Sequence, residues 1–262
     1  MEHEQAAARA GVVIRELREL GEFEQVYRLF DEIWHPEPAN APVTVELMAG
    51  FAHTGNYVAG AFAGDAMVGA SVGFLAADRS LHSHVTGAVI GKGVGYALKL
   101  HQRAWCQERG LERITWTFDP LVRRNAYFNL VKLGARPEAY LTEFYGAMAD
   151  AINEGDASDR LLAVWRVHEE EKEKEGAEDA YPLVREADDG QPLVAEDARG
   201  RRVVLVGTPR DVERLRRQDA AAAMAWRMAV REALGGAMAA GARVTRFTEG
   251  GEYVVVMNER AR

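Results

Sequence analysis

The chain lacks several features that define large classes of protein. Its 262 residues include a single cysteine, Cys106, which excludes an internal disulfide and any metal site built from several cysteines. No apolar run approaches the roughly 18 residues that a membrane-spanning helix needs, and no secretory leader pattern follows Met1. We therefore expect a cytoplasmic protein with no membrane partner and no bound metal, and we expect Cys106 to be a buried, inert thiol.

The chain also lacks a long basic run. Its 32 basic and 40 acidic residues give a formal net charge of −8. We therefore expect no basic surface that could neutralise several successive phosphates of a nucleic acid. The hydrophobic content of 48% is high enough to bury one large core or two unequal ones. The composition thus predicts a globular protein that does not bind nucleic acid.

Hydrophobic periodicity predicts a regular series of elements over residues 11–167. Strands are expected over 11–17, 57–62, 66–75, 81–90, 113–118, 140–148 and 161–167, and helices over 22–34, 43–51, 94–109 and 123–133. Gly64-Asp65 predicts a hairpin turn between two of these strands. The order β-α-α-β-β-β-α-β-α-β-β predicts an α/β (α+β) domain over residues 1–168.

The composition changes after residue 168. The segment 168–180 reads HEEEKEKEGAEDA and offers almost nothing to bury, so residues 169–199 are expected to form a charged linker. A strand over 202–206, a helix that begins at Thr208-Pro209 and runs to about 240, and a hairpin over 243–257 then predict a small β-α-β-β module in residues 200–262. Because roughly 56 residues cannot bury a secure core alone, we expect this module to pack on the first domain or on a second subunit, and we expect a homodimer.

Three glycines, Gly91, Gly93 and Gly95, alternate between a predicted strand and a predicted helix. Backbone amides at such a helix start can hold a pyrophosphate, although an ordinary turn between strand and helix also favours glycine. A dinucleotide-binding fingerprint would need glycine at Tyr96, and a Walker A loop would need Ser or Thr at Gly93, so both are excluded.

A more specific pattern comes after the turn. The sequence reads WTFDPL over 116–121, NAYFN over 125–129, KLG over 132–134 and DR over 159–160. With the predicted order of elements, these motifs make the chain resemble the GNAT N-acetyltransferases over about residues 12–167, and in particular a subgroup of predicted acetyltransferases that share WTFDPL. The resemblance implies a mixed central sheet flanked by helices, and transfer of an acyl group from acetyl-CoA or another acyl-CoA to the amine of a small molecule.

The resemblance also implies where the cofactor would bind. In that family, amides of the glycine turn hold the CoA pyrophosphate, and amides of the fourth strand hold the pantetheine arm and polarise the thioester carbonyl. The implied cofactor-binding residues of this chain are Gly87, Ala88, Val89, Lys92, Gly93, Val94, Gly95, Tyr96, Asn125 and Phe128.

Acyl transfer to an amine needs a neutral amine, stabilisation of the oxyanion and a proton for the departing sulfur. His82 and His84 alternate on the predicted strand over 81–90, and we expect His84 to relay the proton, against the alternative of a structural hydrogen bond. Asp119 ends the next strand and is a second candidate, although Asp-Pro also opens turns. Tyr127 is the candidate acid, with core packing as its alternative role.

Three residues are candidates for binding the acceptor substrate. Arg124 and Arg160 can each hold a carboxylate by paired hydrogen bonds, and Asn129 lies on the same side of its predicted helix as Asn125. Ile90 stands where the family commonly has Arg or Gln. Leu130 stands where the family commonly has tyrosine. They favour an alternative function, a protein that binds acyl-CoA without turnover. A third alternative is a protein-interaction module that binds no CoA.

Overall fold

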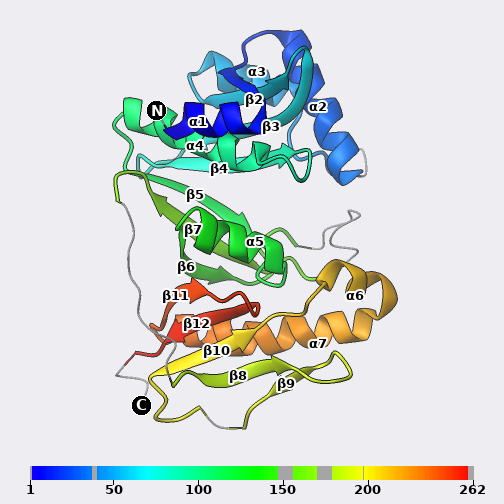
Figure 1. The fold of residues 1–262 in the computed structure, drawn as a ribbon, viewed down its shortest axis with the longest axis vertical. Coiled ribbons are helices and arrows are strands. Elements are labelled where there is room, and N and C mark those ends of the chain that lie inside the picture. Colours follow the sequence, from blue (N-terminus) through cyan, green and yellow to red (C-terminus); the bar gives the residue numbers. More distant parts are fainter. Residues whose placement is uncertain (1, 37–39, 147–155, 170–178, 197, 259–262) are drawn as a thin grey trace. The chain divides into compact units, whose positions relative to one another are not determined.

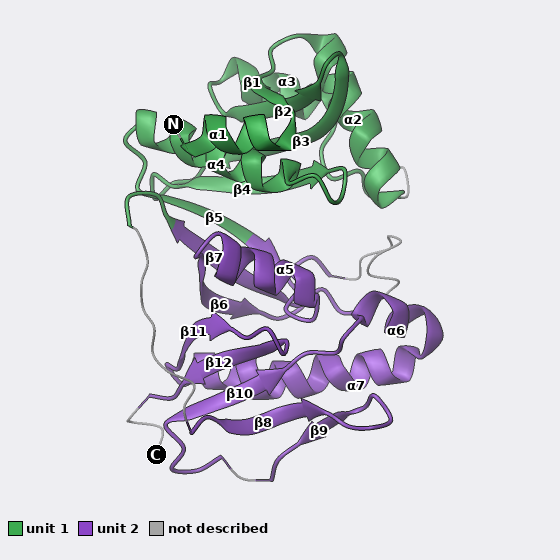
Figure 2. Cartoon of the chain, in the orientation of Figure 1, with its two compact units in different colours: residues 1–116, 166–169 green, residues 117–165, 170–262 purple. Residues whose placement is uncertain are grey.

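The computed structural model describes residues 2–36, 40–146, 156–169, 179–196 and 198–258 (Figure 1). The chain divides into two compact units (Figure 2). The first comprises residues 1–116 and 166–169, and the second comprises residues 117–165 and 170–262.

The first unit is built on a mixed sheet with the strand order β1-β2-β3-β4-β5. These strands are β1 (Val13–Glu16), β2 (Tyr57–Ala63), β3 (Ala66–Leu75), β4 (Leu81–Ala88) and β5 (Arg113–Phe118). Neighbours from β1 to β4 are antiparallel, whereas β4 and β5 are parallel. The expected hairpin is confirmed, because Ala63 pairs with Ala66 across Gly64-Asp65 and Gly64 has a φ of +60°.

Helices cover both faces of this sheet (Figure 1). They are α1 (Glu2–Ala10), α2 (Leu20–Trp34), α3 (Val45–His53) and α4 (Val94–Glu108). One apolar cluster joins α2 and α3 to the sheet through Phe30, Met48 and Val72, and a second joins α4 through Leu98 and Ala61. The order of the predicted elements is confirmed in this unit, except that α1 was not expected.

The last two residues of β5 belong to the second unit. In this unit the strand order of the sheet continues as β5-β7-β6. It contains α5 (Arg123–Tyr127), a π-helical turn η2 (Phe128–Lys132), β6 (Arg136–Leu141) and β7 (Arg160–Arg166). The mixed sheets flanked by helices are the fold class expected from the sequence.

A five-stranded sheet with the order β11-β12-β10-β8-β9 completes the second unit. Its strands are β8 (Tyr181–Glu186), β9 (Pro192–Val194), β10 (Val203–Gly207), β11 (Arg243–Phe247) and β12 (Glu252–Val256). The helical segment between β10 and β11 consists of α6 (Val212–Gln218), α7 (Ala220–Val230), η3 (Arg231–Gly235) and α8 (Gly236–Ala239). The β-α-β-β order of the module is thereby confirmed.

The expectation of a linker over 169–199 needs a correction. Residues 170–178 lie outside the described residues, but Tyr181–Glu186 and Pro192–Val194 are strands. They form because β8 pairs in parallel with β10 and buries Val184, a partner that no local pattern reveals. In the described part of the chain, no helix is long and apolar enough to cross a membrane.

Candidate functional site

β4 contains a β-bulge at His84. Val85 pairs with Val72 and Ser83 pairs with Gly73, so His84 is an extra residue with no partner on β3. A bulge bends its strand and redirects the side chains on either side. The bulge therefore divides β4 into a part that pairs with β5 and a part that does not.

The pairing of β4 with β5 covers Leu81↔Ile114 and His82↔Thr115. From Ser83 onward, the outer edge of β4 has no strand partner among the described residues of the first unit. We call the place where this pairing ends the β4 fork. Its unpaired edge presents backbone groups that can bind an extended ligand.

Only some amides of β4 face that edge. Val89 N donates to Val68 O at 2.9 Å, so the Val89 amide faces β3. Because hydrogen-bonded residues alternate along an antiparallel pair, the Gly87 amide also faces β3, whereas the amides of Thr86 and Ala88 face the fork. Of the three amides expected to bind pantetheine, only that of Ala88 faces the fork. The amide of Thr86, which the sequence analysis did not name, faces it as well.

The glycine turn leads directly into α4. Gly91 and Gly93 have φ values of +95° and +75°, which other residues rarely adopt. Gly93 is the N-cap of α4, and Ala97 N donates to Gly93 O at 3.0 Å. The amides of Val94, Gly95 and Tyr96 precede this first bond, no side chain caps them, and the first turn has no acidic residue. The helix start thus has the charge and donors of an anion site.

Gly95 differs from the other two glycines. Its φ lies outside the positive range, and a Cβ atom added there would have no neighbour within 4 Å. Among the residues that the structure describes, neither the backbone conformation nor the packing therefore requires glycine at this position. Lys92 of the same turn is exposed, and Ile90 is 91% exposed.

The two histidines of β4 have different partners. His84 Nε2 lies 2.8 Å from the carbonyl oxygen of Pro42, so Nε2 carries the hydrogen and Nδ1 is the basic nitrogen of the neutral ring. His82 Nδ1 lies 3.1 Å from Thr115 Oγ1 on β5. Burial lowers the pKa of His82, with further lowering from the charges of His84 and Lys99, which keeps His82 neutral at pH 7.

Five of the expected site residues lie on α5 and η2 in the second unit, and Arg124 is the most N-terminal of them. Asn125 is exposed, Tyr127 and Phe128 are half-buried, and Asn129 is buried. Lys132 Nζ lies 5.8 Å from the centroid of the Tyr127 ring. The helix passes from α to π geometry between Tyr127 and Phe128, a distortion that is frequent at functional sites.

Asp119 is buried in a network of four charges. Its carboxylate accepts from Arg227 at 2.9 and 3.0 Å and from Arg216 at 2.6 Å, and both arginines also bind Asp156. Although burial opposes its ionisation, the Arg227 and Arg216 guanidinium groups hold the pKa of Asp119 well below its usual range. A carboxylate so engaged does not accept a proton near neutral pH, which argues against a role of Asp119 as the base.

The expected substrate-binding arginines also have partners within the second unit. Arg124 forms a bidentate pair with Glu213 of α6, with distances of 2.6 and 2.5 Å. Arg160 is buried, and its guanidinium carbon lies 5.5 Å from the centroid of the Tyr145 ring. A substrate carboxylate would have to displace Glu213 to bind Arg124.

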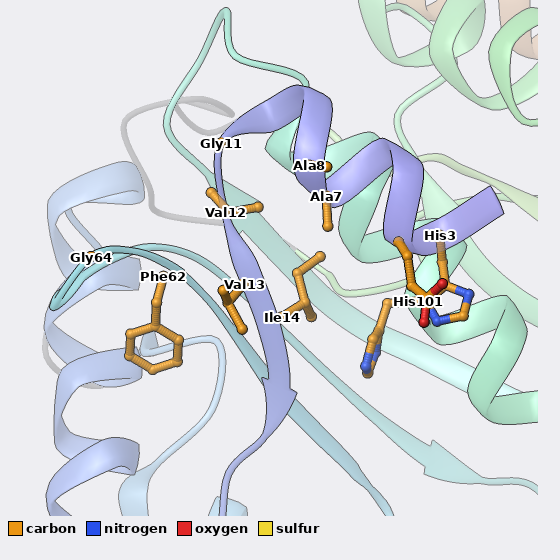
Figure 3. Close-up of a pocket in the computed structure, with 11 residues that line it drawn as sticks. His3, Ala7, Ala8, Gly11, Val12, Val13, Ile14, Phe62, Gly64 and His101 are labelled. Atoms are coloured by element: carbon orange, nitrogen blue, oxygen red, sulfur yellow. The ribbon is translucent and has the colours of Figure 1, made fainter. Parts of the chain in front are cut away.

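The first unit also has a hollow of about 570 Å³ between α1, β1 and the turn after β2 (Figure 3). Ala7, Val12, Ile14 and Phe62 give it an apolar wall, and His101 lies at one side (Figure 3). None of the expected site residues lines it. The hollow is therefore separate from the fork and the glycine turn.

Neither a protein-family model nor a curated protein sequence matches the chain. Solved structures do match. The yncA protein of Salmonella typhimurium, a proposed acetyltransferase solved with its cofactor acetyl-CoA, aligns with a TM-score of 0.50 and 10% identity, over 63% of this chain and 99% of that one. Over the aligned part, the chain shares the fold of that protein.

Two further matches have lower TM-scores. A proposed GNAT-family acetyltransferase from Desulfovibrio desulfuricans aligns with a TM-score of 0.49 and 17% identity, over 60% of this chain and 99% of that one. The ribosomal-protein-S18-alanine N-acetyltransferase of Escherichia coli aligns with a TM-score of 0.46 and 13% identity, over 62% of this chain and 97% of that one.

Proposed function

We propose that this chain is an acyl-CoA-dependent N-acyltransferase, with acetyl-CoA as the preferred donor and a small-molecule amine as the acceptor. The GNAT fold, the anion-binding start of α4 and the unpaired edge of β4 support the proposal. In the ternary complex, the amine attacks the acyl carbon directly, so no covalent enzyme intermediate forms.

Gly95 is the observation that carries the proposal. Glycine is less favourable than alanine in a helix, by up to about 1 kcal/mol in the helix interior. Nothing in the described part of the chain requires it, because a Cβ atom at this position would have no neighbour there within 4 Å. A glycine that neither the backbone nor the packing explains is expected where a ligand approaches the backbone closely, and amides at a helix N-terminus favour a phosphate.

The fork supplies the second part of the proposed site. Acyl-CoA provides an acyl group that is activated as a thioester. The amides of Thr86 and Ala88, which face the unpaired edge of β4, are donors for the pantetheine arm or for the carbonyl oxygen on which charge develops. Backbone amides suit this role because they are already oriented and need no reorganisation during the reaction.

Proton transfer is assigned to His84 and Tyr127. The hydrogen bond from His84 Nε2 to Pro42 O leaves Nδ1 as an acceptor for a proton of the amine. The Tyr127 hydroxyl is the candidate donor to the departing sulfur. We assign no proton transfer to Asp119, because two arginines already bind its carboxylate.

The acceptor is proposed from charge alone. A formal net charge of −8 favours a cationic amine over an anionic one. Asn129, Arg124 and Arg160 stay candidates for substrate binding, with Arg124 available only when Glu213 is displaced. A cytoplasmic location and a homodimer stay predictions.

Thermal-shift screening with acetyl-CoA and longer acyl-CoAs, followed by a thiol-release assay on a panel of amines, tests the proposal. We expect a raised melting temperature with an acyl-CoA and thiol release with at least one amine. Binding with no turnover on any amine would favour the non-catalytic alternative. Absence of binding to every acyl-CoA would contradict the proposed function.

A further inference from the structure

Lys99 is a buried lysine on the sheet-facing side of α4. It is 5% exposed, and its Nζ donates to Ser83 Oγ at 2.7 Å and to Gln102 Oε1 at 3.4 Å. No aspartate or glutamate of the described residues forms an ion pair with it. Burial of an amine without an opposite charge costs free energy, and an apolar side chain of similar shape would stabilise the fold more.

The position of this amine coincides with the β4 fork. The last pair of β4 and β5 is His82↔Thr115, so the next pair in register would be Ser83 and Trp116. Both of these side chains contact Lys99 Nζ, Ser83 by its hydrogen bond and Trp116 with its ring centroid at 4.0 Å. The Lys99 amine therefore contacts both strands at the point where their pairing ends.

A chain of buried hydrogen bonds continues from Lys99 to the far side of the bulge. Gln102 Nε2 donates to Ser71 Oγ at 3.3 Å, and Ser71 Oγ lies 2.7 Å from Thr86 Oγ1. Ser83 and Thr86 thus anchor the two sides of the bulge at His84 to the same polar network under α4. Such a network fixes a backbone shape that apolar packing alone leaves free.

We propose that Lys99 is a positioning residue of the acyl-CoA site, which holds the β4 fork open and keeps the amides of Thr86 and Ala88 directed at the pantetheine arm. This inference rests on the proposed function. Lys99 acts through β4 and need not touch the substrate. Burial lowers the pKa of Lys99 to about 7, and the neutral amine still has two hydrogens for its two acceptors.

The variant Lys99→Met, with a side chain of similar length and no polar atom, tests this role. We expect its melting temperature to rise, hydrogen exchange of residues 83–88 in the free protein to become faster, and its Kd for acetyl-CoA to rise about tenfold. Cys106→Ala is the matched control, because Cys106 is a buried residue on the same helix. It should lower the melting temperature and leave both the β4 exchange and the affinity unchanged.

The opposite changes in stability and in binding distinguish positioning from packing. Unchanged exchange over 83–88 together with unchanged acetyl-CoA affinity in Lys99→Met would overturn the inference. So would a result like that of Cys106→Ala, with lower stability and normal binding. If Lys99→Met does not fold, Ser83→Ala removes the same hydrogen bond. Hydrogen exchange of residues 83–88 and the acetyl-CoA affinity of that variant then test the inference by the same criteria.

The failure of the proposed function would have a different signature. If the wild-type protein binds no acyl-CoA, the proposed function fails, and the exchange of residues 83–88 alone decides whether Lys99 positions β4. If the wild type binds acetyl-CoA and Lys99→Met binds it equally well with normal exchange, the function stands and the inference about Lys99 fails.

Discussion

Arg227 binds both carboxylate oxygens of Asp119, with Nη1 2.9 Å from Oδ1 and Nη2 3.0 Å from Oδ2. The pair is bidentate, the strongest geometry for an arginine and a carboxylate. It joins α7 to the turn after β5, and Tyr253 OH on β12 donates to Pro120 O of the same turn at 2.8 Å. The C-terminal module thereby packs on residues of the predicted first domain, one of the two partners expected from the sequence. A homodimer stays a prediction.

The variant Asp119→Asn is expected to lose about 3 to 5 kcal/mol of stability, because it leaves Arg216 and Arg227 with one buried carboxylate fewer. Urea unfolding measures the loss. Asp188→Asn, at an exposed aspartate of the same unit, should change the stability little. A stable Asp119→Asn protein that binds acetyl-CoA but has no turnover would restore Asp119 as the base.

Local patterns predicted most of the fold. Alternating apolar residues gave the strands around the Gly64-Asp65 turn, and the alternate glycines gave the start of α4, because both signals act within a few residues. The strands β8 and β9 were missed because β8 depends on pairing with β10, a distant partner. Tertiary pairing of this kind leaves no periodic signal in a short, charged segment.

The candidate site was predicted less completely for the same reason. Asp119 ends a strand, as catalytic acids often do, but its partners Arg216 and Arg227 lie 97 and 108 residues away in the sequence. Lys99 interrupts the apolar face of α4, and nothing near it in the sequence indicates that it is buried at the fork. The direction of the Thr86 amide depends on the register with β3 and on the bulge.

The stability of Lys99→Met relative to the wild type should depend on pH. The folded-state pKa of Lys99 is about 7, whereas that of an unfolded lysine is about 10.4, so the unfolded wild type binds more protons between these values. Wild-type stability therefore rises with pH in this window, by up to about 1.4 kcal/mol per pH unit from this group. The gain in unfolding free energy of Lys99→Met over the wild type should be largest at pH 7 or below and should shrink towards pH 9.

The titratable neighbours of Lys99 do not interfere in this range. Burial lowers the pKa of His82 on β4 and raises the pKa of the Cys106 thiol on α4 to about 12, so neither group changes its charge in the folded protein between pH 7 and pH 9. Their titration in the unfolded chain is the same for both proteins and cancels in the comparison. Urea unfolding of both proteins at the two pH values measures the difference. An equal gain in stability at pH 7 and pH 9 would show that burial does not lower the pKa of Lys99 into this range.

Tyr127→Phe should lower turnover about a hundredfold and leave the affinity for acetyl-CoA nearly unchanged, because the hydroxyl would act mainly as the sulfur departs. Thiol release gives kcat, and calorimetry gives the affinity. Tyr145→Phe, at an exposed tyrosine of the same unit, is the control and should keep both values. A wild-type kcat in Tyr127→Phe would remove this residue from the mechanism.

A chain that ends at Arg199 should be less stable or insoluble. The deletion removes Arg216 and Arg227, which leaves the carboxylates of Asp119 and Asp156 without their partners. Light scattering with a thermal melt measures the outcome and the oligomeric state. A soluble, truncated protein with the melting temperature and assembly of the full chain would disprove the packing role of the module.

The central claim is that acyl-CoA binds at the start of α4, and calorimetry of acetyl-CoA binding to Gly95→Asp tests it most directly. An aspartate in the first helical turn should stabilise the fold by about 0.3 to 1 kcal/mol, since it favours the helix dipole and meets no neighbouring atom. The same carboxylate would repel the phosphates of CoA. Gly95→Ala, which adds a methyl group and no charge, is the control: it should weaken binding where the ligand approaches the backbone, but less than Gly95→Asp does. We predict a Gly95→Asp protein that melts at a higher temperature than the wild type and binds no acetyl-CoA, and wild-type affinity in that variant would contradict the account.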